Sequence, residues 1–176
     1  FDQSMGIIDP QTDLKRPDQQ MVYDIFKKAY EANSFEILKP EKELRIPKII
    51  HVMWLGGKLP QEFERYVESW YTHHPDWTIL FWTDNEKNYD RGTKIVRSFD
   101  DLSKLLSEEQ PAQRIVIDSR NLQYDNKIFY DQAVNYGEKS DILKWEIVYR
   151  FGGVYVDTDF ECLKPLDPFH YTYDFY

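Results

Sequence analysis

Two aspartates stand close together directly after a short apolar run near the end of the chain. The run is Val154-Tyr155-Val156, and Asp157-Thr158-Asp159 follows it. No base occurs between Val154 and Lys164, so these carboxylates have no local counter-charge. Carboxylate oxygens are the ligands that Mg²⁺ and Mn²⁺ prefer, and parallel sheets bind ligands where their strands end. The pattern therefore predicts a site for a divalent cation.

The spacing of the two aspartates leaves two geometries open. If the strand continues, Asp157 and Asp159 project from the same side, and if the chain turns they can still converge on one ion. An EF-hand calcium loop is excluded, because its sixth and twelfth positions, counted from Asp157, are Cys162 and Pro168 rather than Gly and Glu. A phosphatase with an aspartyl nucleophile fits poorly, because Glu161 stands where that motif has Thr or Val.

The segment before the aspartates predicts the helix that helps to position them. Ser140 or Asp141 is placed to cap its start, and Gly152-Gly153 ends it, since glycine takes the left-handed conformation that helix ends need. A broad apolar face is predicted for this helix from Ile142, Leu143, Trp145, Ile147, Val148, Tyr149 and Phe151.

Earlier segments alternate between strand and helix patterns. Strands are predicted at 49–54, 77–82 and 114–117, and helices around 63–70 and 100–108. A strand, a helix and a strand within about 35 residues indicate a right-handed parallel crossover. The fold class is therefore α/β, with a mainly parallel sheet flanked by helices.

The N-terminal part has a different character. An amphipathic helix of about 13 residues is predicted after Pro17, which suits a first helical turn. Residues 35–47 are charged and contain two prolines, as in a connector. We therefore expect an N-terminal helical extension with its connector at 1–45 and the α/β domain at 46–176.

Composition excludes several classes of protein. The formal net charge of −9 repels nucleic acid and anionic membranes, so a nucleic-acid partner is not expected. Cys162 is the only cysteine, which excludes an intramolecular disulfide. No apolar run approaches the roughly 20 residues of a membrane span.

His51 lies inside an apolar strand and is expected to be a hydrogen-bonded core residue.

Three segments together resemble the glycosyltransferases that carry a DXD motif. They are Ile46-Pro47-Lys48-Ile49-Ile50-His51 leading to Trp54-Leu55-Gly56-Gly57, then Ser140-Asp141-Ile142-Leu143-Lys144, and finally 149–159. The group that they resemble includes the yeast initiating mannosyltransferase, bacterial capsular sugar transferases and the large glucosylating toxins. The resemblance covers about 46–168 and implies a GT-A-type nucleotide-sugar-binding domain.

The resemblance also implies roles for single residues. Asp159 would bind Mn²⁺ or Mg²⁺ directly, and Asp157 would bind it through water or hold ribose and sugar hydroxyls, which makes this pair the catalytic one. Asp141 would contact donor sugar hydroxyls, Trp54 would stack on the base, and Tyr155 would contact the donor. Where many members have Arg, this chain has Lys144, which keeps the charge but loses the planar fork. Without the resemblance, Trp54 and Tyr155 fit a core role and Asp141 fits a helix cap.

The implied activity is transfer of a sugar from a nucleotide sugar, with a UDP-sugar favoured, to an acceptor hydroxyl on a glycan or protein. Family members continue with segments that complete the site, so the chain is expected to be a fragment that lacks the acceptor part. The alternative function is that of a non-catalytic nucleotide-sugar-binding module. A third interpretation is an α/β domain with an acidic loop and no such function. A cytoplasmic location is favoured, with a secreted effector or a removed N-terminal anchor as alternatives.

Overall fold

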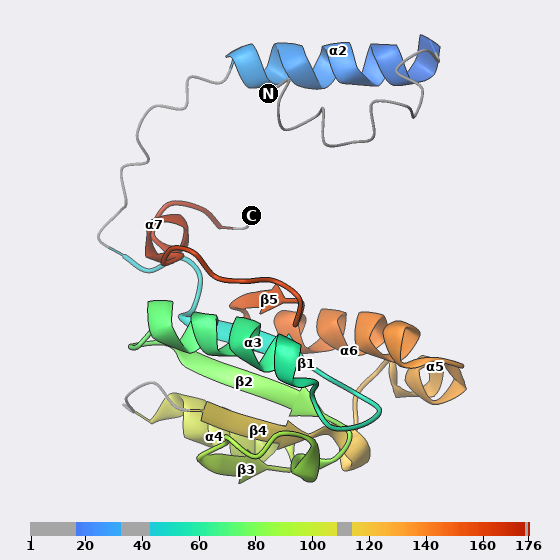
Figure 1. Cartoon of the computed structure of the whole chain (residues 1–176), viewed down its shortest axis with the longest axis vertical. Helices are drawn as coiled ribbons and strands as arrows, with labels where there is room; N and C mark the ends of the chain where they lie inside the picture. Colours follow the sequence, from blue (N-terminus) through green and yellow to red (C-terminus); the bar gives the residue numbers. More distant parts are fainter. Residues whose placement is uncertain (1–16, 33–42, 109–113, 175) are drawn as a thin grey trace. The chain divides into compact units, whose positions relative to one another are not determined.

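The computed structural model of the chain describes residues 17–32, 43–108, 114–174 and 176 (Figure 1). Backbone contacts divide the chain into two units, Phe1–Leu38 and Lys39–Tyr176. In the first unit, α2 (Pro17–Ala32) confirms the predicted amphipathic helix, and its apolar side chains Met21, Val22, Ile25 and Phe26 are exposed. Residues 35–42 of the predicted connector lie outside the described residues, and the division at 45/46 stays a prediction.

The second unit is built on a five-stranded sheet in which every pairing is parallel. The strand order is β3-β4-β2-β1-β5. The strands are β1 (Ile49–Met53), β2 (Thr78–Thr83), β3 (Lys94–Val96), β4 (Arg114–Asp118) and β5 (Val154–Val156). The helices are α3 (Gln61–His73), α4 (Phe99–Ser107), α5 (Lys127–Gln132), α6 (Tyr136–Phe151) and α7 (Asp167–His170), with 3₁₀ turns η1 (Glu86–Asn88) and η2 (Ser119–Asn121). The predicted α/β class is confirmed.

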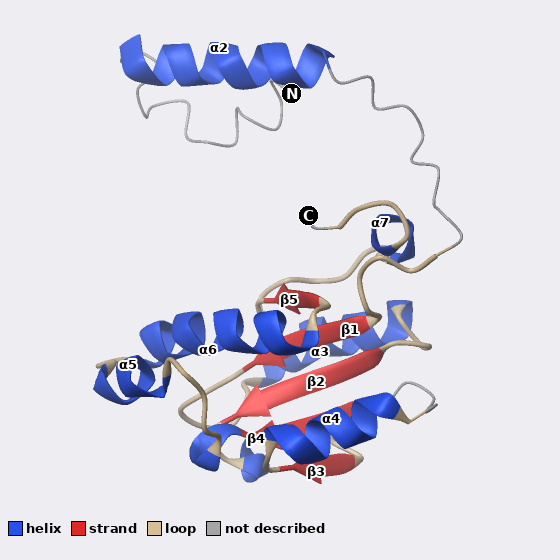
Figure 2. Cartoon of the chain, turned by 180° about the vertical axis from the view of Figure 1, so that it is seen from behind, coloured by secondary structure: helices blue, strands red, loops and turns tan. Residues whose placement is uncertain are grey.

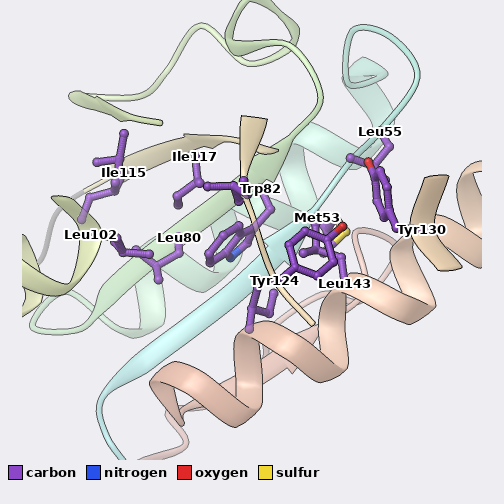
Figure 3. Packing of buried hydrophobic residues seen from close by; sticks show 13 residues of the cluster. Met53, Leu55, Leu80, Trp82, Leu102, Ile115, Ile117, Tyr124, Tyr130 and Leu143 are labelled. Atoms are coloured by element: carbon purple, nitrogen blue, oxygen red, sulfur yellow. The ribbon is translucent and has the colours of Figure 1, made fainter. Parts of the chain in front are cut away.

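Helices cover both faces of the sheet. Figure 1 shows α3 in front of the strands, and Figure 2, seen from behind, shows α4 and α6 on the other face. The core is divided accordingly. Val67 and Trp70 of α3 belong to one apolar cluster with Phe81, whereas Leu102 of α4 and Leu143 of α6 belong to the other (Figure 3). Because both faces are covered, β1 and β2 are mostly apolar rather than alternating.

Helix α6 begins earlier than predicted, so the predicted cap is wrong. Asn135 caps the helix by accepting a hydrogen bond from the Glu138 amide (2.8 Å), and the Glu138 carboxylate accepts one from the Val134 amide (3.0 Å). This reciprocal arrangement satisfies two amides at the helix start. Ser140 and Asp141 therefore lie inside the helix, and their side chains are available for other contacts.

The predicted apolar face of α6 is also partly wrong. Leu143 and Ile147 are buried, but Trp145 is 72% exposed and Tyr149 is 90% exposed. The helix instead buries Glu146, whose carboxylate accepts a hydrogen bond from Arg150. A buried carboxylate with its own cation one turn away avoids most of the cost of an unpaired charge.

The two glycine pairs occupy backbone conformations that favour glycine, which the sequence predicted for Gly152-Gly153. Gly56, Gly57, Gly152 and Gly153 all have positive φ. Gly153 joins α6 to β5 at φ +81°, where an added Cβ would lie 2.4 Å from the carbonyl oxygen of Ile49. The absence of a side chain therefore allows β5 to begin directly against the first residue of β1.

We expect Gly153→Ala to lower the free energy of unfolding by at least about 2 kcal/mol. A left-handed backbone alone costs a residue with a Cβ about 1–2 kcal/mol, and the overlap with Ile49 adds to it. Gly137→Ala at the other end of the same helix is the control, and it should stay within about 1 kcal/mol of the parent in urea unfolding. Equal stability of the two variants would contradict this close approach.

His51 is the polar exception within β1. Its side chain is fully buried, its Nδ1 accepts a hydrogen bond from the Trp82 indole (3.1 Å), and its Nε2 lies 2.8 Å from the Gly152 carbonyl oxygen. Because indole N–H only donates and a carbonyl only accepts, the ring is the neutral tautomer with its proton on Nε2. The predicted core role is confirmed, and burial lowers the pKa of His51 to about 4.

This shift makes stability depend on pH. Between a pH of about 6.5 and about 4, the unfolded chain binds a proton that folded His51 does not, so stability falls as the pH decreases. One such group contributes a slope of up to about 1.4 kcal/mol per pH unit. Urea unfolding between pH 7.5 and 5 should show this loss, and His51→Gln should be less stable but less pH-dependent. An unchanged slope in the variant would contradict this assignment.

Candidate functional site

The parallel sheet brings the ends of its strands to one edge, here called the carboxyl edge. Val52 of β1 is in register with Val156 of β5. Trp54 and Asp157 therefore leave two neighbouring strands at the same edge, although about a hundred residues separate them in sequence. This edge is where open α/β sheets bind ligands.

The two aspartates lie in a turn and not on a continued strand. The amide of Phe160 donates to the carbonyl oxygen of Asp157 (3.2 Å), which reverses the chain. Asp157 and Asp159 are exposed, whereas Thr158 between them is buried. Of the two geometries that the sequence left open, the structure has the turn, in which both carboxylates face solvent.

The segment after this turn is tied to α3. The Trp70 indole donates to the carbonyl oxygen of Phe160 (2.9 Å), and the amide of Cys162 donates to the Ser69 hydroxyl (2.7 Å). The main-chain atoms in these two bonds belong to residues one and three positions after Asp159, so the bonds hold the acidic turn in place. No sequence pattern pointed to Trp70 or Ser69, because their partners are main-chain atoms far along the chain.

Three predicted site residues meet where α6 faces β5. Lys144 pairs with Asp141 (2.6 Å between Nζ and Oδ1), and its ammonium lies 5.7 Å from the centre of the Tyr155 ring. The Tyr155 hydroxyl lies 3.2 Å from the hydroxyl of Ser140. The Asp141 side chain is 68% exposed, so it can accept further hydrogen bonds.

Tyr155 connects this cluster with the acidic turn. Burial and the nearby carboxylate of Asp157 raise the pKa of Tyr155 to about 12, although the hydrogen bond with Ser140 acts in the opposite direction. The phenol therefore keeps its proton at neutral pH and can donate a hydrogen bond. The structure thus brings Asp141, Lys144, Tyr155 and Asp157 together.

Trp54 lies at the exit of β1, on the strand next to β5. Its amide donates to the carbonyl oxygen of Trp82 (2.9 Å), and its ring packs on Phe63 with 5.4 Å between ring centres. The side chain is only partly buried. Phe63 therefore supports one part of the indole while another part stays accessible at the carboxyl edge.

Two further acids at this edge did not stand out in the sequence. Asp84 follows β2 and accepts hydrogen bonds from the amide of Gly56. Asp118 ends β4; burial alone would raise the pKa of its carboxyl, but hydrogen bonds from Arg120 hold it below the ordinary value. The sequence pattern that could have identified them is the one that identified Asp157, namely an acidic residue at the end of an apolar run.

The acidic turn suits a cation that takes only part of its coordination from protein. Neither Asp157 nor Asp159 forms an ion pair with a described residue. Across the described ranges, no group of three or more His, Cys, Asp or Glu side chains is arranged to hold a metal. Mg²⁺ is commonly bound by one or two carboxylates together with waters and substrate phosphates, so this donor set fits it.

A groove of about 540 Å³ lies elsewhere, between α3 and residues 161–163. Its lining is polar, but its charges are largely engaged with one another. Arg91 pairs with Glu64 (2.9 Å) and Glu68 (3.3 Å), both inside the groove. None of the predicted site residues lines this groove, so it is distinct from the cluster at the carboxyl edge.

Residues 60–176 match the model of the family described as the glycosyltransferase sugar-binding region containing a DXD motif. The match covers most of the chain and includes the acidic turn and the α6 cluster. The chain therefore belongs to this glycosyltransferase family, as the resemblance of its motifs predicted.

Individual relatives agree with this family. Inositol phosphoceramide mannosyltransferase 1 of Schizosaccharomyces pombe is 28% identical over 73% of this chain and 33% of its own length. Subversion of eukaryotic traffic protein A of Legionella pneumophila is 29% identical over 70% of this chain and 18% of its own. The chain thus spans a third or less of these relatives. A solved structure of PaToxG glycosyltransferase aligns with a TM-score of 0.46 and 21% identity, over 83% of this chain and 52% of that one.

No helix among the described residues is long and apolar enough to cross a membrane.

Proposed function

We propose that the chain is the donor-binding part of a metal-dependent glycosyltransferase, which moves a hexose from a nucleotide sugar to an acceptor hydroxyl. The observation that carries this proposal is that the exposed acidic turn lies near Asp141, Lys144 and Tyr155 at the carboxyl edge of the sheet. The chain that has this arrangement belongs to a glycosyltransferase family. The mannosyltransferase names of several relatives support a hexose donor. A UDP-sugar and a glycan or protein acceptor are the more specific form of the proposal.

The acidic turn would hold the cation. Asp159 would bind Mn²⁺ or Mg²⁺ directly, and Asp157 would bind it through water or hold ribose and sugar hydroxyls. When bound, the cation supplies positive charge that stabilises the departing diphosphate. The turn's attachment to α3 would keep both carboxylates in place when no cation offsets their mutual repulsion.

The cluster on α6 and β5 would orient the donor sugar. The Asp141 carboxylate can accept further hydrogen bonds, here from sugar hydroxyls. The protonated Tyr155 hydroxyl can donate a hydrogen bond to an oxygen of the nucleotide sugar. Lys144 would add positive charge beside the diphosphate. The ion pair with Asp141 supports this role, because it restricts the rotation of the Lys144 side chain.

Trp54 would stack on the nucleotide base, and Phe63 would support the indole from behind. Trp54→Ala should weaken donor binding by about 1–3 kcal/mol, or roughly 5- to 150-fold, while the melting temperature stays within a few degrees of the parent. Titration calorimetry with a panel of UDP- and GDP-sugars in the presence of Mn²⁺ measures this.

Trp145→Ala is the matched control for Trp54, because it removes an exposed indole from the outer side of α6. Its donor affinity should equal that of the parent. Unchanged affinity in Trp54→Ala would remove Trp54 from the site, and unfolding of that variant would favour the core role.

Asp159→Asn tests the metal. The substitution keeps the side-chain shape but removes one negative charge, so Mn²⁺ binding and Mn²⁺-dependent donor binding should fall together. Since the turn offers only two carboxylates, Mn²⁺ should bind the parent more tightly when a nucleotide diphosphate is present. Asp131→Asn on α5 is the control, because Asp131 is an exposed acid paired with Lys127. Isothermal titration of the parent and both variants, with and without chelator, gives the six affinities to be compared.

Equal donor binding by the parent and Asp159→Asn, with and without Mn²⁺, would contradict metal dependence. Donor binding without transfer or hydrolysis would favour the alternative function, a non-catalytic nucleotide-sugar-binding module. Both results come from the same protein preparations when a product assay accompanies the calorimetry.

A further inference from the structure

The loop between β1 and α3 contains a glycine turn that no strand pairing holds. Gly56 and Gly57 have φ angles of +86° and +145°, and they follow Trp54 by two and three residues. Glycine loses much conformational entropy when it is fixed, so two adjacent glycines need specific contacts to keep one conformation. These contacts determine where the chain goes after Trp54.

Asp84 supplies the main contact. Both of its carboxylate oxygens lie 3.1 Å from the amide nitrogen of Gly56, which donates to them. The carboxylate is itself held, because the Asn88 side-chain amide donates to its Oδ1 (2.9 Å) and to the Thr83 hydroxyl (3.1 Å). Hydrogen bonds to an ionised acceptor are stronger than neutral ones, so a carboxylate suits this place.

The same short segment holds the other end of the loop. The amide of Leu59 donates to the carbonyl oxygen of Asn88 (3.1 Å), and Asn88 is buried. Residues 84–88 therefore fix the loop near both of its ends, at Gly56 and at Leu59. On its open side the Tyr136 ring packs so closely on Gly56 that an added Cβ would lie 2.2 Å from it.

Trp54 is anchored just before this turn. Its amide is bound to Trp82, the second residue before Asp84, and its ring rests on Phe63 just beyond the loop. If the turn at Gly56 were released, both the main chain after Trp54 and the approach of α3 would gain freedom. The indole would then sample orientations that do not present its face to a base.

We infer that Asp84 is a positioning residue for donor binding, because it locks the Gly56-Gly57 turn and thereby fixes the indole of Trp54. This inference rests on the proposed function. The hydrogen bonds that the structure gives Asp84 are with Gly56, Asn88 and no other described residue, so we assign its effect on donor binding to the loop. A substitution of Asp84 should therefore lower donor affinity only when Trp54 is present.

A double-mutant cycle measures that dependence. Donor binding in Mn²⁺ is titrated for the parent, Trp54→Ala, Asp84→Ala and the double variant. We expect Asp84→Ala to weaken binding about tenfold, the scale of one lost charge-assisted hydrogen bond. The double variant should bind about as weakly as Trp54→Ala alone, because the indole that Asp84 positions is already absent.

Two further variants separate positioning from loss of stability. Asp84→Asn keeps one oxygen for the Gly56 amide, so it should recover part of the affinity that Asp84→Ala loses. Lys48→Met removes the ion pairs with Asp76 and Asp167 (2.7 Å each), which lie where the strands begin, at the opposite edge of the sheet. It should lower the melting temperature without changing donor affinity by more than about twofold.

Each failure has its own pattern. Additive losses in the double variant, or normal affinity in Asp84→Ala while Trp54→Ala is impaired, would overturn the inference and leave the proposed function intact. A parent protein that binds no nucleotide sugar would overturn the proposed function and the inference with it. Equal losses of donor affinity in Lys48→Met and Asp84→Ala would assign the effect to stability alone and overturn the inference.

Discussion

The parallel pairing of β1 with both of its neighbours is the constraint on which the rest of the structure depends. Val52 faces Phe81 of β2 on one side and Val156 of β5 on the other. This register places the exits of all three strands at one edge. Trp54, Asp84 and Asp157 become neighbours only because of it.

The buried polar contacts of β1 reinforce that register. Trp82 of β2 contacts β1 twice, since its indole donates to His51 and its carbonyl oxygen accepts from Trp54. His51 in turn contacts Gly152, where α6 ends and the chain turns toward β5. One histidine thus joins β1 to the end of the helix that carries Asp141 and Lys144. The same burial that aligns these elements makes the fold sensitive to acid.

The sequence could predict those parts of the fold that depend on local patterns. Continuous apolar runs predicted β1, β2 and β4, and Gly152-Gly153 predicted a helix end at positive φ. Other elements lacked such a signal. The strand β3 and the helix α7 have only three and four residues, too few for a periodicity. The outer side of α6 was wrongly predicted as core, because Trp145 and Tyr149 are apolar in type although no described element covers them.

In the candidate site, too, some residues could be predicted from the sequence and others could not. Asp157 and Asp159 could be selected from their position after a strand, and the motif resemblance added Trp54, Asp141, Lys144 and Tyr155. The support around these residues could not be selected, because it consists of long-range bonds to main-chain atoms. The bonds from Trp70 to Phe160 and from Gly56 to Asp84 are examples.

Under the proposed function, metal and nucleotide bind together at the carboxyl edge, and paramagnetic NMR tests this claim most directly. Mn²⁺ added with a nucleotide diphosphate to the ¹⁵N-labelled chain broadens amide signals according to their distance from the ion. We expect the earliest losses at residues 157–160, followed by the start of α6 and the turn at Gly56. Losses centred on the groove beside α3, or broadening that does not depend on the nucleotide, would contradict the claim.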